Sequence, residues 1–180
     1  MIYMFLAEGF EEIEALGTLD ILRRAKIDVC TVGVTSQKIT GSHGIAVVCD
    51  KTISEISKEE CSGVILPGGL PGTTNLEKSE VVQNFIDFAA EKELPIAAIC
   101  AAPSILGHKK LLEGKKATAY PGYEDDLYGA EYSSLPAEKD GMYITGKGAG
   151  AVFEFGFKIV EMLKGFETAN ALRSSMQCVK

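Results

Sequence analysis

Short apolar runs alternate with longer amphipathic stretches along this chain, and this alternation constrains the fold more than any other feature of the sequence. Strands are expected at residues 2–7, 28–34, 63–66, 96–99, 115–119 and 141–145. Helices are expected at residues 12–26, 79–93, 102–106, 151–163 and 167–176. Strands that alternate with helices are typical of a mostly parallel sheet in an α/β protein. Residues 45–49 are expected to join a short antiparallel excursion, and residues 120–136 to be irregular.

The size and composition of the chain indicate one domain that covers residues 1–180. With 180 residues, 46% of them hydrophobic, the chain can bury one sizeable core, and no repeat or linker divides it. The formal net charge of −7 argues against the basic face that a binder of nucleic acid or of an anionic membrane needs. No apolar stretch approaches the length of a membrane span. We therefore expect neither nucleic acid nor a membrane as a partner.

The N-terminal residues and the cysteines favour a cytoplasmic location. Residues 1–6 are apolar, but they lack a basic flank and soon meet Glu8, so they indicate a buried first strand rather than a signal peptide. The number of cysteines, five, is odd, and no C-x-x-C motif is present. Neither a disulfide framework nor a metal site is therefore expected. Packing or incidental positions are expected for all cysteines but one, namely for Cys30, Cys49, Cys61 and Cys178.

Cys100 is the exception, because it lies where an expected strand ends and a helical stretch begins. The free N–H groups at the start of a helix stabilise an anion, so they favour a thiolate over a thiol. Small residues two positions away on either side, Ala98 and Ala102, match the spacing that permits the tight turn of a nucleophile elbow. The sequence therefore predicts a reactive cysteine at this position.

Two further segments follow expected strands and should lie at the same edge of the sheet as Cys100. They are residues 7–12, after the first strand, and residues 67–72, the glycine-rich turn PGGLPG. This turn could present a backbone N–H to an oxyanion, or its glycines could serve only the tight turn. It matches neither of the glycine-rich patterns that bind nucleotide phosphates, and no cofactor is expected.

Among the acids at the start of the first helix, Glu14 stands out, since it lies within an apolar run and is predicted to turn inward. Burial raises the pKa of a carboxyl group, and a protonated Glu14 could donate a hydrogen bond to a thiolate at Cys100. Favourable interaction with the helix dipole accounts for the other acids, which are Glu8, Glu11 and Glu12.

The two histidines offer Cys100 little support as general bases. His108 follows Cys100 by eight residues, or ~12 Å along a helix, which is beyond hydrogen-bond reach. It is expected near a helix C-terminus beside two lysines. His43 lies in a Gly-Ser-His-Gly turn whose position the sequence does not fix. A cysteine–histidine hydrolytic dyad is therefore only weakly supported.

Five segments together resemble the DJ-1/ThiJ/PfpI superfamily, in particular the branch of the parkinsonism-associated protein and its bacterial ThiJ-like relatives. They are AEGFEEIE at 7–14, DILRRA at 20–25, VILPGG at 64–69, AAICAAP at 97–103 and TGKGAG at 145–150. The resemblance implies a flavodoxin-like three-layer α/β sandwich with helices on both faces of the sheet, usually a homodimer. It implies a nucleophilic Cys100 of low pKa beside a protonated Glu14, with the backbone of Gly69 and Ala101 around an oxyanion. It also implies that Cys100 oxidises readily to a sulfinate.

The chain departs from the family pattern around the expected pocket, for which Gly68, Tyr120 and Ala149 are the candidate residues. Ala102, Ala149 and Tyr120 stand where the best-known member has glycine, proline and histidine. The protease-like branch has a histidine directly after the cysteine, where this chain has Ala101, so peptidase activity is disfavoured.

The resemblance implies a stress-response enzyme of the glyoxalase or deglycase type, acting without a cofactor on small reactive carbonyl compounds or early glycation adducts. The alternative is a protein without catalysis, in which oxidation of Cys100 serves a redox sensor or a redox-regulated chaperone. The thiazole-synthesis label of ThiJ-like proteins finds no supporting residues, and the triad of a glutamine amidotransferase cannot be assembled. The sequence leaves open the physiological substrate and whether turnover or oxidation is the main role.

Overall fold

The centre of the computed structural model, which describes residues 1–178, is a seven-stranded sheet with strand order β10-β11-β7-β6-β1-β2-β5. All neighbours in it are parallel except β10 and β11. The strands are β1 (Ile2–Leu6), β2 (Val29–Gly33), β5 (Lys51–Thr52), β6 (Gly63–Leu66), β7 (Ile96–Ile99), β10 (Ala137–Asp140) and β11 (Tyr143–Gly146). The expectation of a mostly parallel sheet is confirmed.

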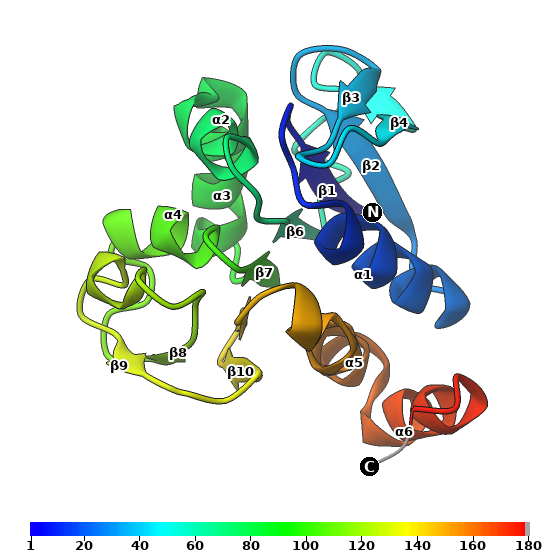
Figure 1. Ribbon diagram of the computed structural model, residues 1–180, viewed down its shortest axis with the longest axis vertical. Coiled ribbons are helices and arrows are strands. Elements are labelled where there is room, and N and C mark those ends of the chain that lie inside the picture. Colours follow the sequence, from blue (N-terminus) through cyan, green and yellow to red (C-terminus); the bar gives the residue numbers. More distant parts are fainter. Residues whose placement is uncertain (179–180) are drawn as a thin grey trace.

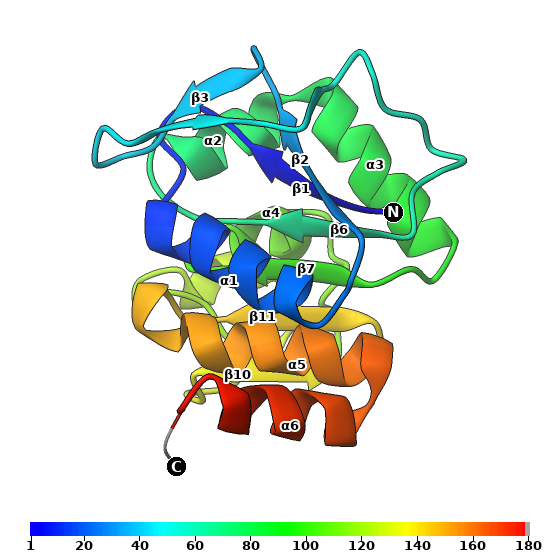
Figure 2. The same ribbon diagram turned by 90° about the vertical axis from the view of Figure 1, so that its right-hand side faces the viewer.

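Helices cover both faces of this sheet, as Figures 1 and 2 show. One face packs against α2 (Gly72–Lys78), α3 (Glu80–Glu91) and α4 (Pro103–His108). The other packs against α1 (Glu12–Arg24) and α5 (Val152–Lys164), and α6 (Phe166–Ser175) lies on the outer side of α5. Successive strand residues point to opposite faces, so Tyr3 and Phe5 belong to the first core and Ile2 and Met4 to the second. This is the three-layer, flavodoxin-like sandwich that the sequence predicts.

Local sequence explains where the main helices begin and which side they bury. Ser79 caps α3 by accepting a hydrogen bond from the Val82 N–H at 3.4 Å, and Glu11 caps α1 by accepting one from the Glu14 N–H at 2.7 Å. In α3 the buried residues Val82, Phe85, Ile86 and Ala89 follow helical spacing. No helix within residues 1–178 is both long and apolar enough to cross a bilayer.

The structure differs from the prediction where the chain is polar. Helix α2 and strand β10 were not predicted, because their sequences GTTNLEK and AEKD carry little apolar periodicity. The strand expected at 115–119 is only β8 (Lys116–Ala117), which pairs with β9 (Glu131–Tyr132) outside the central sheet. The 120–136 segment otherwise holds one short helix, η1 (Glu124–Asp126). The antiparallel excursion exists as the hairpin of β3 (Lys38–Thr40) and β4 (Ala46–Val48).

Two apolar residues that periodicity placed on buried helix faces are exposed instead. Ile13 of α1 is 60% exposed and Phe153 of α5 is 50% exposed. The two helices run side by side (Figure 2), and a Cβ at Gly17 of α1 would lie 2.7 Å from a side-chain carbon of Val152. The helix starts therefore pack closely through their inner residues, which leaves Ile13 and Phe153 on the outer side.

Candidate active site

The three segments predicted to converge do so, because β7, β6 and β1 are neighbours in the sheet. Leu66 of β6 pairs with Ala98 of β7, and Met4 of β1 pairs with Ile65 of β6. Parallel strands end at one edge of a sheet, so Cys100, the turn at Gly68 and the start of α1 meet there. The strand order reverses here, because the chain runs from β1 to β2 and β5 on one side and then continues with β6 on the other side of β1. The carboxyl ends of the strands at such a point are the usual location of a site in an open α/β sheet.

The backbone of Cys100 is held in a conformation that side chains other than glycine rarely adopt. Its φ is +66°, in the left-handed region. Its N–H donates to the Gly146 carbonyl at 2.8 Å, and its carbonyl accepts from the Tyr120 N–H at 2.8 Å. These two bonds fix a strained turn between β7 and α4, of the kind that clusters at functional sites.

Glu14 lies beside Cys100, as predicted, and its side chain is almost fully buried. The residue is 1% exposed, and its Oε2 accepts a hydrogen bond from the Gly68 N–H at 2.9 Å. A Cβ on Gly68 would lie 2.6 Å from the Cβ of Cys100 and 2.6 Å from that Glu14 oxygen. Only glycine fits here, because the backbone passes directly against both side chains.

The Glu14–Cys100 pair resists carrying two negative charges. Burial raises the pKa of Glu14 to about 7, although hydrogen bonds from Cys100 and Gly68 oppose the shift. Burial and the neighbouring Glu14 carboxylate raise the pKa of the Cys100 thiol to about 12, against backbone hydrogen bonds at Ala101 and Gly69. The low thiol pKa that the resemblance implies is therefore not found, because burial raises it first and the Glu14 carboxylate raises it further. A thiolate at Cys100 requires Glu14 to keep the shared proton.

The expected backbone donors, Gly69 and Ala101, both act on the Cys100 thiol. Their hydrogen bonds favour the thiolate and lower its pKa. Gly69 also has a structural reason to be glycine, since its φ is +90° and a Cβ would lie 2.4 Å from the Glu11 nitrogen. The steric interpretation of the glycine-rich turn is therefore confirmed, and its role at an oxyanion stays a prediction.

The three pocket candidates do not share one surface. Tyr120 and Ala149 line a hollow of about 470 Å³, together with Pro121, Ser134, Pro136, Lys147, Gly148, Gly150 and Ala151. Gly68 does not line this hollow but lies against Glu14 and Cys100. Cys100 does not line the hollow, but its backbone is bonded to the residues around it: the Tyr120 N–H donates to the Cys100 carbonyl, and the Cys100 N–H donates to Gly146, which precedes Lys147.

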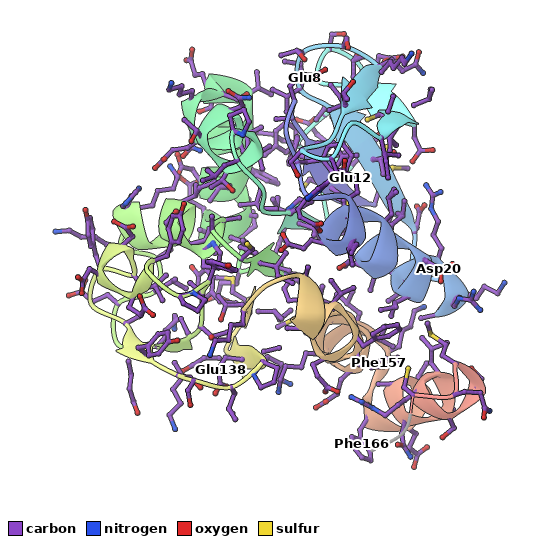
Figure 3. All side chains as sticks on the ribbon, viewed as in Figure 1. Glu8, Glu12, Asp20, Glu138, Phe157 and Phe166 are labelled. Atoms are coloured by element: carbon purple, nitrogen blue, oxygen red, sulfur yellow. The ribbon has the colours of Figure 1, made fainter. Side chains whose placement is uncertain are left out.

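Glu12 has a role that the helix-dipole argument missed. It is 4% exposed, and its carboxylate accepts hydrogen bonds from the backbone N–H of His43 at 2.8 Å and of Ile45 at 3.3 Å. The His43 Nδ1 lies 2.9 Å from it. Glu8, in the loop before α1, accepts a hydrogen bond from the Thr40 N–H at 3.1 Å. Glu8 and Glu12 (both labelled in Figure 3) therefore bind the β3–β4 hairpin to the segment that follows β1.

The Glu12 contact also fixes the position of His43, which the sequence left open. Glu11, Glu12 and His43 bring their ligand atoms within 4.8 Å of one another, and no other group of this kind occurs in residues 1–178. Both oxygens of Glu12 already accept hydrogen bonds from the hairpin.

His108 ends α4, as expected, and its ring contacts two acidic side chains. Its Nδ1 lies 2.5 Å from the Glu77 carboxylate and its Nε2 lies 3.4 Å from Asp126. No hydrogen bond in the described chain joins Cys100 to either histidine, so the structure holds no cysteine–histidine dyad. The sequence did not single out Tyr123, which lies near the cysteine. Burial is the main cause of the raised pKa of Tyr123, and negative charge at Cys100 is the second cause.

The remaining cysteines fit the packing interpretation in part. Cys30, Cys49 and Cys61 are buried, and Cys178 is half-buried. Burial raises the pKa of Cys49 to about 11 and shifts the pKa values of Cys30 and Cys61 in the same direction. All five cysteines are free.

A cysteine on a strained turn beside a buried carboxyl group, at the carboxyl edge of a flavodoxin-like sheet, defines a cysteine-elbow α/β protein. Residues 1–162 match the family model described as the DJ-1/PfpI family. The chain belongs to this family, and the resemblance seen in the sequence is confirmed.

Curated relatives and a solved structure support this membership. The chain is 33% identical over 178 residues to the Parkinson disease protein 7 homolog of Danio rerio, covering 96% of this chain and 94% of that protein. It is 31% identical over 168 residues to a glutathione-independent glyoxalase of Caenorhabditis elegans, covering 92% and 89%. A DJ-1 superfamily crystal structure from Salmonella typhimurium superimposes with a TM-score of 0.93 at 32% identity, covering 99% and 98%.

Some relatives are much longer than this chain. The DJ-1 homolog A of Arabidopsis thaliana is 35% identical over 173 residues, covering 94% of this chain but only 44% of the relative. The chain thus spans less than half the length of that protein, and 37% of the related homolog B.

Proposed function

We propose that this protein is a stress-response enzyme of the glyoxalase type, in which Cys100 attacks reactive aldehydes and Glu14 moves the protons. The observation that carries the proposal is a buried carboxyl group with a pKa of about 7 against a thiol on a strained turn. A group with a pKa near the working pH is suited to general acid–base catalysis. The relative named a glutathione-independent glyoxalase supports the same chemistry.

The first step uses the form of the pair in which Glu14 holds the proton and Cys100 is a thiolate. The thiolate sulfur forms a bond to the aldehyde carbon of methylglyoxal, and the carbonyl electron pair moves to oxygen. The Glu14 carboxyl group gives its proton to that oxygen, which yields a hemithioacetal and a Glu14 carboxylate. Backbone N–H groups of Gly69 and Ala101 stabilise the developing negative charge.

The second step moves hydrogen between the two carbons of the substrate. The Glu14 carboxylate removes the proton from the former aldehyde carbon to give an enediol and returns it to the neighbouring carbon. The hydroxyl proton moves from the first oxygen to the second, so one carbon is oxidised to a thioester carbonyl and the other is reduced to an alcohol. No external oxidant is needed. Water then hydrolyses the resulting thioester to lactate and restores the cysteine. For an early glycation adduct, the same attack would precede release of the amine.

The test is lactate formation from methylglyoxal by the wild-type protein and by Cys100→Ala. We expect the substitution to abolish turnover. Cys178→Ala is the matched control, because Cys178 is the other half-buried thiol and lies outside the site. Equal lactate formation by wild type and Cys100→Ala would overturn the assignment.

A redox role is the second candidate, and the same pair favours it. A protonated Glu14 could hold a sulfinate at Cys100 by a hydrogen bond, as it would hold the thiolate. Mass spectrometry after mild peroxide treatment should find Cys100 oxidised before Cys30 and Cys178. An oxidation rate at Cys100 no higher than at those two cysteines would remove this candidate.

We also propose that the protein is a cytoplasmic homodimer. Ile13 and Phe153 expose large apolar surfaces on adjacent helix starts, which is typical of a protein–protein contact. Five free thiols suit a reducing compartment. Sedimentation should give a dimer mass for the wild type, and Ile13→Glu should shift it toward the monomer.

A further inference from the structure

The hollow beside Cys100 contains a single charged side chain. Of its lining residues only Lys147 is ionic, and the remainder are apolar, glycine, serine or tyrosine. Carbon-rich walls come from Pro121, Pro136, Ala149 and Ala151. Small-molecule sites commonly combine such apolar walls with a few fixed polar groups.

The positive charge of Lys147 is not matched by the protein. Its Nζ contacts the Ser134 carbonyl at 3.4 Å, and within residues 1–178 it forms no ion pair with a carboxylate. Lys139, by comparison, pairs with Glu161 at 3.8 Å. The Lys147 side chain is half-buried, but its ammonium group is exposed and can meet an anionic ligand that enters the hollow.

The start of α5 adds to the positive potential at this place. Helix α5 has 13 residues, and its N-cap residue, Ala151, provides no side-chain hydrogen bond to the first turn. Gly148, Ala149 and Gly150 line the hollow just before this helix start. The partial positive charge of the helix end and the ammonium group therefore act on the same space.

We propose that this hollow binds a carboxylate of the substrate, with Lys147 as the specificity-determining residue. A single ammonium group matches the single charge of a carboxylate, whereas a phosphate would bring a second charge that the hollow does not neutralise. The preferred substrates would then be carbonyl compounds or glycation adducts with a carboxylate attached to a short apolar body, such as adducts of amino acids. This proposal deepens the proposed function and rests on it for the reaction.

Binding can be tested without turnover, by the rate at which Cys100 is alkylated. N-ethylmaleimide and 3-maleimidopropionate share one reactive ring, but only the second carries a carboxylate. We expect the ratio of anionic to neutral labelling rates to fall about fivefold in Lys147→Gln, as for loss of one exposed ion pair. Lys147→Arg should keep the ratio, and added salt should reduce it in the wild type.

Two controls make the ratio interpretable. Lys92→Gln removes an exposed lysine at the end of α3, at the opposite edge of the sheet, and should leave the ratio unchanged. Cys100→Ala gives the background from the other cysteines. An unchanged ratio in Lys147→Gln, or an equal fall in Lys92→Gln, would overturn the proposal.

The two proposals can fail separately. Alkylation requires only a reactive Cys100, so a carboxylate preference without lactate formation would reject the enzymatic assignment and keep the anion site. Lactate formation without a preference for the anionic maleimide would keep the enzymatic assignment and reject the anion site. Circular dichroism shows whether Lys147→Gln is folded. If it is not, the ratio of anionic to neutral labelling rates is measured in Lys147→Met, a second neutral variant, and the same fall is expected.

Discussion

Glu12 and Glu14 lie two residues apart in α1 and are 4% and 1% exposed, yet their acidities differ widely. The pKa of Glu12 is about 2 and that of Glu14 about 7. Two causes explain the difference. Glu14 lies deeper among protein atoms, which raises its pKa more, and Glu12 receives more hydrogen bonds, which lower its pKa.

Glu12 faces the hairpin, which offers it several donors, including two backbone N–H groups and the His43 ring. These bonds outweigh burial and keep Glu12 ionised. Glu14 faces one backbone N–H, from Gly68, and a thiol that competes for the same negative charge. The same residue type therefore serves as a structural clamp at one position and as a proton carrier at the other.

The largest effect is expected from removing the proton of Glu14. Glu14→Gln retains the shape but cannot exchange a proton, so Cys100-dependent lactate formation should fall at least about 100-fold. Glu14→Asp should be intermediate. Glu12→Gln is the matched control on the same helix and should retain most of the activity in its folded fraction. Equal losses from Glu14→Gln and Glu12→Gln would contradict the distinction between the two acids.

The second effect is on the pH dependence of stability. The folded protein holds the Glu14 proton up to a pH of about 7, whereas the unfolded chain releases it near 4.5. Because the native state binds more protons in that interval, the free energy of unfolding should fall by about 3 kcal/mol as pH rises through it. Urea denaturation of wild type and Glu14→Gln from pH 4 to pH 8 gives the difference. Parallel profiles would show that Glu14 is not buried as a neutral acid.

How far the sequence could predict these features depends on whether their causes are local. The buried strands follow from apolar runs, and the position of Cys100 follows from the end of a strand, so both were predicted from local sequence. The pairing of Glu14 with Cys100 became specific only through the resemblance to the family. Strand β10 was missed because its residues, AEKD, are polar at the edge of the sheet. The Glu12 clamp was missed because its partners lie about 30 positions further on, in a hairpin whose placement only the tertiary structure determines.

The third effect is the loss of the clamp itself. Glu12→Ala removes the acceptor for the His43 and Ile45 N–H groups and should lower the free energy of unfolding by about 2 kcal/mol, as for hydrogen bonds to a charged group. The pKa of Glu12 is lowered, so its contribution is present above pH 4.5 and is lost as pH falls toward 2. Denaturation at neutral pH measures the loss. Glu8→Ala, which removes one exposed hairpin contact, is the control and should cost less.

The smallest effect belongs to His43, whose ring is mostly exposed. The hydrogen bond to Glu12 raises the pKa of His43, so its contribution to stability is full below pH 6.5 and is lost as pH rises through the folded-state value. Since Glu12 must also be ionised, His43→Gln should destabilise the protein most between about pH 4.5 and pH 6.5. Thermal melts of wild type and His43→Gln at pH 5.5 and pH 9 test this. A difference between the two proteins that is larger at pH 9 would show that the imidazole is not the charged partner of Glu12, and that the backbone N–H groups alone keep this carboxylate ionised.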